Sequence, residues 1–148
     1  MVDSRQKGAR AESGAKDILR RYTGLNWQRV PASGALGPEH GMKGDLYIAK
    51  SNNIFCVEVK HYKDDQLSTK VLTSVKPTIY DWWEQALRQG EQVEAEPLLI
   101  FKHDRSKYFV CFQSEPESID YEYIYLSEYA IFIAKLEDWL KWEEILWV

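Results

Sequence analysis

Apolar residues recur at helical spacing in three parts of the chain and predict three helices. The first covers residues 5–23, where apolar positions stand among basic ones, and Gly24 follows as a stop signal. The second covers residues 78–90 and is expected to end at Gly90. The third covers residues 135–146 and is rich in tryptophan and glutamate.

Between these helices, short apolar and β-branched runs bounded by turn residues predict strands. The expected strands cover residues 27–31, 45–50, 53–60, 97–102, 108–113 and 121–126. Ser51-Asn52 is expected to form a tight hairpin turn. Loops are predicted at 33–44, which holds four glycines and a proline, and at the polar stretch 61–76. This order predicts the α/β or α+β class, with a central mixed β-sheet flanked by helices.

Composition narrows the class of protein. The 148 residues, 45% hydrophobic and 28% charged, suit a single globular domain over residues 1–148. No apolar run approaches the roughly 20 residues of a membrane span. The N-terminus lacks the apolar segment of a secretory signal, so we expect a cytoplasmic protein with no membrane partner. Cys56 and Cys111 lie in apolar runs and are predicted to be buried free thiols.

Charge is unevenly distributed along the chain, although the net charge is −4. Residues 1–76 hold 13 lysines and arginines against 8 acidic residues, whereas residues 77–148 hold 6 against 15. This asymmetry is consistent with a cationic face for a polyanion such as DNA. The alternative is that the two halves of the sequence do not map onto two faces.

The strongest chemical signal is Glu58-Val59-Lys60 following Asp45. Side chains alternate along a strand, so Glu58 and Lys60 point to one face of a strand that is otherwise apolar. Burying unpaired charge costs several kcal/mol, on the order of a protein's whole stability margin, and therefore requires a reason. With Asp45 on the neighbouring strand, two carboxylates would form the oxygen-rich site that Mg²⁺ prefers. The alternative is a structural salt bridge between Lys60 and one of these acids.

The order Glu12, Ser33-Gly34, Gly44-Asp45 and Glu58-Val59-Lys60 resembles the PD-(D/E)xK nuclease superfamily. Within it, the chain looks most like the archaeal-type Holliday junction resolvases and their phage relatives. Three stretches carry this resemblance. Residues 7–12 are similar to the opening helix of that group, residues 29–34 to its strand and serine loop, and residues 97–102 to the strand after its second helix. Gly44 departs from the pattern, because the superfamily's name expects proline there.

The resemblance implies a restriction-endonuclease-like core in the order αβββαβ, over about residues 5–113. The acidic, tryptophan-rich extension 114–148 lies outside this resemblance. By the same resemblance, Mg²⁺ or Mn²⁺ would be held by Asp45, Glu58 and the Val59 carbonyl, with Glu12 completing the shell. Lys60 would orient the attacking water or stabilise charge that develops on the phosphate.

Further residues are implicated less directly. Ser33 could hydrogen-bond the scissile phosphate, although a loop serine is more often a turn residue. Six basic residues are predicted to contact DNA phosphates, which positions a duplex without reading its sequence: Lys7, Arg10, Arg29, Lys43, Lys63 and Lys102. His61 would point away from Lys60 and is not expected to act as a ligand or base. Trp139 and Trp142 make the last helix apolar on more than one side, which favours a homodimer interface.

Three hypotheses follow. The first is a homodimeric Mg²⁺-dependent DNA endonuclease that prefers branched DNA such as a four-way junction. It would act in the cytoplasm, or in the host cytoplasm if a phage encodes the protein. The second is a nuclease for linear duplex, flaps or single strands, because one fold hosts many activities. The third is a catalytically inactive DNA-binding subunit, which the acidic tail suggests and the intact acid–lysine set opposes.

Overall fold

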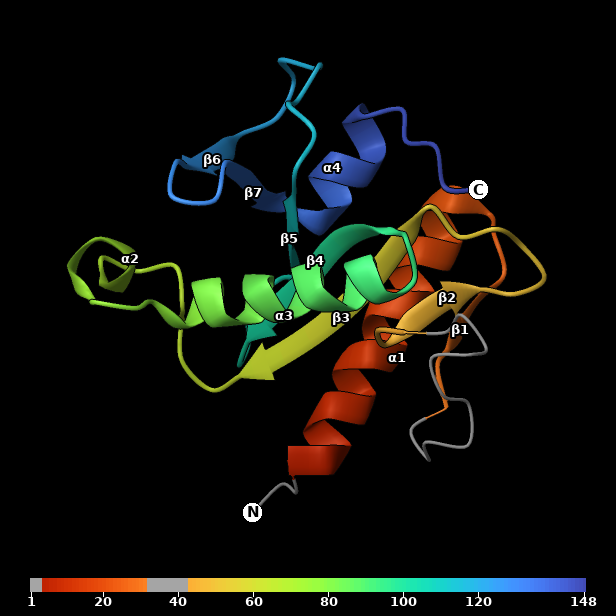
Figure 1. Ribbon diagram of the computed structural model, residues 1–148, viewed down its shortest axis with the longest axis horizontal. Helices are drawn as coiled ribbons and strands as arrows, with labels where there is room; N and C mark the ends of the chain where they lie inside the picture. Colours follow the sequence, from red (N-terminus) through yellow and green to blue (C-terminus); the bar gives the residue numbers. More distant parts are fainter. Residues whose placement is uncertain (1–3, 32–42) are drawn as a thin grey trace.

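A seven-stranded mixed sheet forms the centre of the computed structural model, which describes residues 4–31 and 43–148, with side chains from Gln6 onward (Figure 1). The strand order is β1-β2-β3-β4-β5-β7-β6. The strands are β1 (Trp27–Arg29), β2 (Leu46–Ile48), β3 (Phe55–Tyr62), β4 (Glu96–His103), β5 (Phe109–Phe112), β6 (Tyr123–Leu126) and β7 (Ile131–Lys135). The helices are α1 (Ser4–Thr23), α2 (Lys70–Thr73), α3 (Thr78–Gln92) and α4 (Leu136–Trp142).

The topology confirms the predicted fold class and the predicted core order. Strands β1, β2 and β3 pair antiparallel in sequence order, and α3 then carries the chain across to β4, which pairs parallel to β3. A parallel neighbour requires such a crossover, usually a helix. The remaining strands pair antiparallel and extend the sheet, so β6 and β7 of the C-terminal segment belong to the same sheet as the core.

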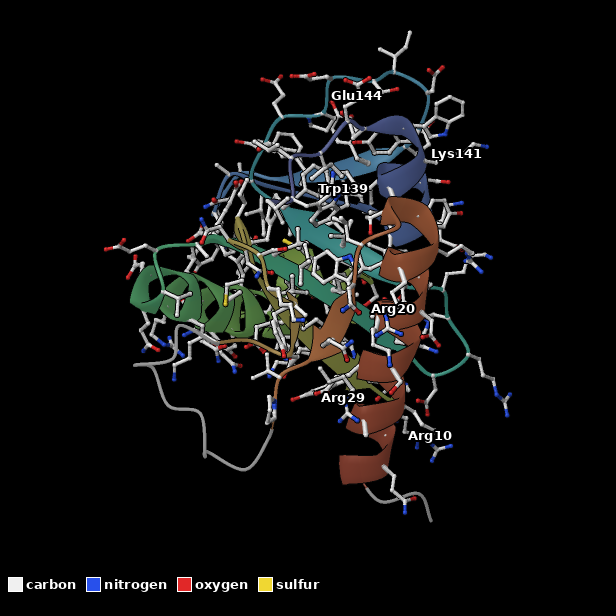
Figure 2. The ribbon with its side chains drawn as sticks, turned by 90° about the vertical axis from the view of Figure 1, so that its right-hand side faces the viewer. Arg10, Arg20, Arg29, Trp139, Lys141 and Glu144 are labelled. Carbon is white, nitrogen blue, oxygen red and sulfur yellow. The ribbon has the colours of Figure 1, made fainter. Side chains whose placement is uncertain are left out.

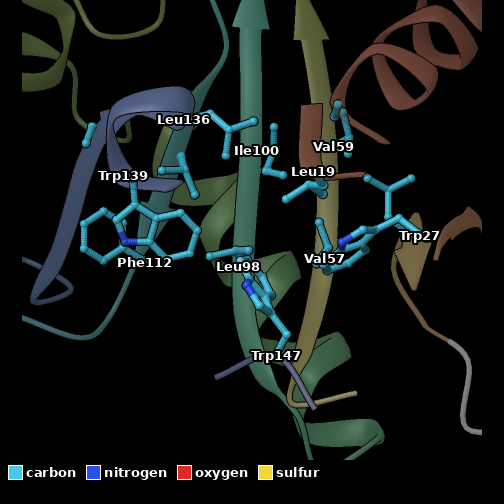
Figure 3. Packing of buried hydrophobic residues seen from close by; sticks show 14 of the residues in the cluster. Leu19, Trp27, Val57, Val59, Leu98, Ile100, Phe112, Leu136, Trp139 and Trp147 are labelled. Carbon is cyan, nitrogen blue, oxygen red and sulfur yellow. The ribbon is translucent and has the colours of Figure 1, made fainter. Parts of the chain in front are cut away.

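Two apolar clusters lie on the two faces of the sheet. Helices α1 and α4 cover one face, where Leu19 and Trp139 meet Val57 and Ile100 of the central strands (Figure 3). Helix α3 covers the other face, where Trp83 packs against Leu99 of β4. Because β3 and β4 have a helical layer on both faces, their central residues, 56–59 and 97–101, are buried, as expected for a parallel pair.

The C-terminal segment completes the first cluster. The ring of Trp147 lies 5.2 Å from that of Trp27 and 5.8 Å from that of Trp139, each edge to face. The Trp147 carbonyl also accepts a hydrogen bond from the Ile54 amide at 3.1 Å, just before β3. The segment after residue 113 therefore braces the entry to the strand that carries Glu58.

Several predicted boundaries were wrong. The predicted tight turn at Ser51-Asn52 is a wider connection, because the Asn53 side chain bonds both the amide and the carbonyl of Ile48 and replaces strand pairing there. Residues 61–76 are not wholly loop, since β3 continues to Tyr62 and α2 follows. No helix among the described residues is long and apolar enough to cross a membrane.

Two further differences concern the ends of helices. Helix α3 passes through Gly90 to Gln92, and Gly90 is needed for space, because a Cβ there would lie 2.7 Å from the Ala95 carbonyl. The predicted third helix begins at Leu136 and ends at Trp142, because the residues before it form β7, which was not predicted. Both cysteines are free and buried, as predicted.

Candidate active site

Glu58 is the only charged side chain that is fully buried in the described part of the chain, at 3% exposure. It lies in the middle of β3, paired in register with Leu99 of β4. Val57 and Val59 belong to the cluster under α1 and α4, so alternation along the strand directs Glu58 and Lys60 to the other face. The predicted split between the two faces of this strand is confirmed.

Asp45 lies where β2 separates from β3. Its amide donates to the Val57 carbonyl at 2.7 Å, and its carboxylate Oδ2 accepts the Val59 amide at 2.7 Å. The second bond replaces the backbone partner that a continued antiparallel ladder would supply. The carboxylate of Asp45 is therefore held against the edge of β3, one residue from Glu58.

The backbone conformation of residue 44 explains why glycine stands where the family pattern expects proline. Its φ is +81°, a left-handed conformation that proline cannot adopt. A Cβ on Gly44 would also lie 2.5 Å from the Val57 carbonyl. Glycine thus allows the chain to turn tightly against β3 and to present Asp45 at this edge.

Glu12 reaches the same region from α1. The Arg29 guanidinium binds its Oε2 through Nε and Nη2, both at 2.9 Å. Burial raises the pKa of Glu12, as does repulsion and hydrogen bonding with Asp45, while Arg29 opposes the shift. Glu12 is therefore coupled electrostatically to Asp45 and is held in place by a residue that was predicted to bind DNA.

The three acids and Lys60 influence one another electrostatically, which brings together the four residues singled out from the sequence. The pKa of Glu58 is raised to about 8, mainly by burial and then by the negative charge and hydrogen bonding of Asp45, with a smaller contribution from Glu12, while Lys60 opposes the shift. Nearby carboxylates raise one another's pKa because their charges repel. Such a cluster is unfavourable without a compensating cation.

The donor set fits a hard divalent cation, which prefers carboxylate and carbonyl oxygens. Asp45 and Glu58 supply two carboxylates. In a strand, the carbonyl and the amide of one residue point to the same side. The Val59 carbonyl therefore points toward Asp45, as the Val59 amide does. Within residues 4–31 and 43–148, however, no three His, Cys, Asp or Glu side chains already stand in an arrangement that could hold a metal ion. The smallest set that fits is therefore these two carboxylates with the Val59 carbonyl, since Arg29 engages Glu12.

The structure brings only some of the predicted DNA contacts together. Lys7, Arg10 and Lys102 line one pocket. Lys43 lines a different hollow with Cys56 beyond β2. Lys63 is exposed just after β3. Ser33 lies outside the described residues.

Several charged residues can be located in Figure 2. Arg10 and Arg29 lie beside the N-terminal half of α1, whereas Glu144 lies at the opposite end, beyond Trp139. Arg20, higher on the same helix, has a structural contact instead, because its Nε donates to the Trp27 carbonyl at 2.8 Å. Lys141 lies near Glu144 at that end, so the labelled residues do not separate by the sign of their charge.

Sequence reasoning missed three side chains around the same end of β3. His61, Asp104 and Tyr108 line the pocket that holds Lys7 and Lys102. The feature that relates His61 to this pocket is the parallel pairing of β3 with β4, which sets His61 beside Lys102. Without that register, a histidine after Lys60 and a basic residue forty positions later show no relation.

The chain is similar to a known family, to a phage protein and to a solved structure. The family described as "Phage putative PDDEXK endonuclease" matches residues 3–144. Protein D14 of Escherichia phage T5 is 47% identical over 122 residues, which are 80% of this chain and 76% of that protein. The solved structure of Archaeoglobus fulgidus Hjc, a Holliday junction resolvase from an archaeal hyperthermophile, aligns with 94% of this chain and 92% of its own, at 18% identity and a TM-score of 0.44.

The family match spans nearly the whole chain and includes every residue of the acid–lysine set. The described structure has the mixed sheet and the buried acid that the PD-(D/E)xK pattern predicts. The chain therefore belongs to the phage PDDEXK endonuclease family and is a nuclease.

Proposed function

We propose that this nuclease is a divalent-metal-dependent DNA endonuclease whose active site consists of Glu12, Asp45, Glu58 and Lys60. The observation that carries the proposal is Glu58, a buried acid at 3% exposure with a pKa raised to about 8 beside a second carboxylate. A structural salt bridge would lower the pKa of its acid, whereas here the burial and the repulsion prevail. Perturbed carboxylates of this kind are typical of functional sites.

Each residue has a defined role in this proposal. Asp45 and Glu58 would hold Mg²⁺ or Mn²⁺ together with the Val59 carbonyl, and Glu12 would contribute to the outer part of the site. When bound, the cation polarises the scissile phosphate and assists activation of water. Lys60 orients the water or stabilises negative charge on the phosphate oxygens. Arg29 holds Glu12, and the Val59 amide holds Asp45.

We further propose that branched DNA, such as a four-way junction, is the preferred substrate. The support is the resemblance of residues 7–12 and 29–34 to the opening helix and serine loop of the archaeal-type resolvases. A junction has two symmetry-related strands to cut, so a two-fold dimer suits the task. Helix α4 supports a dimer less than the sequence predicts, because Trp139 is buried within its own chain and Trp142 is half exposed.

A different surface supports the dimer better. Strand β6 is one of the two outer strands of the described sheet and exposes Tyr123, Ile124 and Tyr125 by 45%, 48% and 52%. An outer strand with exposed apolar side chains is a template for pairing with another chain. The molar mass in solution, measured by light scattering for the wild type and Ile124→Lys, tests this. A wild-type monomer at the concentrations used for cleavage would exclude the dimer.

The nuclease proposal is tested with purified protein and labelled four-way junction, flap and linear duplex, each with Mg²⁺, with Mn²⁺ and with chelator. Asp45→Asn and Glu58→Gln keep the size of each side chain and should reduce cleavage by at least about a hundredfold, the scale for loss of a key electrostatic group. Asp17→Asn, an exposed acid on α1, is the matched control for Glu12→Gln.

Three results would contradict the proposal in distinct ways. Cleavage that persists in chelator would exclude the metal, and full activity of Asp45→Asn would exclude the site. Equal rates on junction and linear duplex would leave the nuclease but exclude the preference for branched DNA.

A further inference from the structure

A basic pocket of about 350 Å³ opens beside the proposed active site, next to α1. We name it the basic pocket, and its main lining residues are Lys7, Arg10, His61, Lys102, Asp104 and Tyr108. It adjoins the acid cluster at two points of the chain. Ala11 lines the pocket and precedes Glu12, and His61 lines it and follows Lys60.

The pocket is held by a specific set of contacts. Parallel pairing of β3 and β4 sets His61 beside Lys102. The Lys102 ammonium lies 5.3 Å from the centre of the Tyr108 ring, a cation–π distance. The Tyr108 hydroxyl donates to the Ala11 carbonyl of α1 at 2.8 Å. Gly14 leaves room for this hydroxyl, because a Cβ there would lie 2.4 Å from it.

The charges of the pocket are only partly neutralised. One oxygen of Asp104 accepts both the Lys7 ammonium at 2.7 Å and His61 Nε2 at 2.8 Å. Within the described parts of the chain, neither Arg10 nor Lys102 forms an ion pair. The buried Nδ1 of His61 also has no hydrogen-bond partner there. A buried polar atom of this kind usually has a water or ligand partner.

We propose that the basic pocket binds a non-scissile phosphate of the DNA backbone, near the phosphate that is cut. This inference rests on the proposed function. Two cationic side chains without acidic partners, an ammonium supported by an aromatic ring and a guanidinium, match the oxygens of a phosphodiester. Ala11 and His61, which line the pocket, adjoin Glu12 and Lys60 in the chain, so one DNA strand can reach both sites. The pocket therefore fixes the register of the strand in the active site.

The test measures DNA binding without cleavage, by fluorescence anisotropy in chelator. The probes are a duplex and a junction, each also prepared with a single uncharged methylphosphonate moved stepwise around the cleavage position. Wild type should lose affinity when the methylphosphonate occupies one particular position. Lys102→Gln and Arg10→Gln should bind the unmodified DNA more weakly and should be insensitive to that position.

A control variant, a salt titration and unfolding curves accompany the binding measurement. Lys141→Gln removes an exposed charge on α4, away from the pocket, and should respond to methylphosphonates as the wild type does. For each lost phosphate contact, the slope of log K against log salt should fall by about 0.9, but not for this control. Unfolding curves verify that each variant is folded.

The possible failures can be told apart. If the pocket variants keep the wild-type sensitivity at every position, the pocket proposal is wrong although the nuclease proposal stands. If inorganic phosphate at constant ionic strength displaces nothing and no position is sensitive, the pocket holds no backbone phosphate. Absence of any DNA binding by the wild type would contradict the proposed function itself.

Discussion

Replacing Glu58 with glutamine should make the protein more stable, and the gain should grow with pH. The pKa of Glu58 is raised from 4.5 to about 8 in the folded protein, so the folded state keeps a proton that the unfolded chain releases. Where the folded state binds more protons, the free energy of unfolding decreases as pH rises. The loss begins near pH 4.5 and is complete above about pH 8.

The size of the effect follows from the shift. Each unit of pKa corresponds to about 1.4 kcal/mol, so ionising Glu58 in the folded state costs up to about 5 kcal/mol. At 3% exposure, solvent does little to screen this cost. Typical domains are stable by only about 5–15 kcal/mol, so the effect should be easily measured. Glutamine has no charge to bury and escapes the penalty.

The assay is urea unfolding followed by tryptophan fluorescence at pH values from 5 to 9 in chelator, for wild type, Glu58→Gln and Glu91→Gln. The last variant removes an exposed acid on α3 and controls for the change in net charge. The difference between Glu58→Gln and wild type should rise by several kcal/mol across this range. Parallel curves for wild type and Glu58→Gln would refute the reasoning, because they would mean that Glu58 is not buried beside a second negative charge.

The same unfolding assay also measures how a divalent metal changes the stability of the folded protein. A ligand that binds only the folded state stabilises it by RT ln(1 + [L]/Kd). Because the cation would bind the ionised acids, Mg²⁺ should stabilise the wild type more at pH 8.5 than at pH 5.5. Glu58→Gln should show little such gain.

Other perturbations test the framework around the site. In thermal unfolding, Gly14→Ala should lower the free energy of unfolding by about 1–3 kcal/mol through overpacking against Tyr108. Gly8→Ala has open space around it and should raise the free energy of unfolding by up to about 1 kcal/mol. Glu143→Ala should cost about 2–3 kcal/mol in urea unfolding, because the carboxylate accepts two backbone amides and the Tyr121 hydroxyl. Gly44→Ala should abolish cleavage and lower the melting temperature, since it combines a positive φ with a contact of 2.5 Å to a β3 carbonyl.

The main elements of the fold could be predicted because their patterns are local. The strand that carries Glu58 was predicted from its apolar residues, and it lies between two apolar clusters. Strand β7 was missed because its turn, residues 127–130, has no glycine, proline or asparagine, and Ala130 takes the positive φ of +51°. The strand also passes directly into α4 without a separating loop. The local signals that mark a hairpin were therefore absent.

The acid–lysine set could be proposed from the sequence because its members share an order typical of a family. The partners that hold the set could not be proposed, because they depend on long-range contacts. Arg29 was assigned to DNA as a surface cation, yet it binds Glu12 across 17 positions. His61 was dismissed because it points away from Lys60, which is correct, but that direction leads into the basic pocket.

The acid cluster can persist in the folded protein because the elements around it cannot separate to relieve the repulsion. Asp45 is held by the Val59 amide and by the conformation of Gly44, and Glu58 is fixed in the strand that both apolar clusters cover. Moving Glu58 into solvent would disrupt the buried packing of β3. The fold therefore maintains an unfavourable arrangement of charge at one edge, and binding of a cation would convert that cost into affinity. On this reasoning, the substitution that most stabilises the free protein should also be among those that most reduce cleavage.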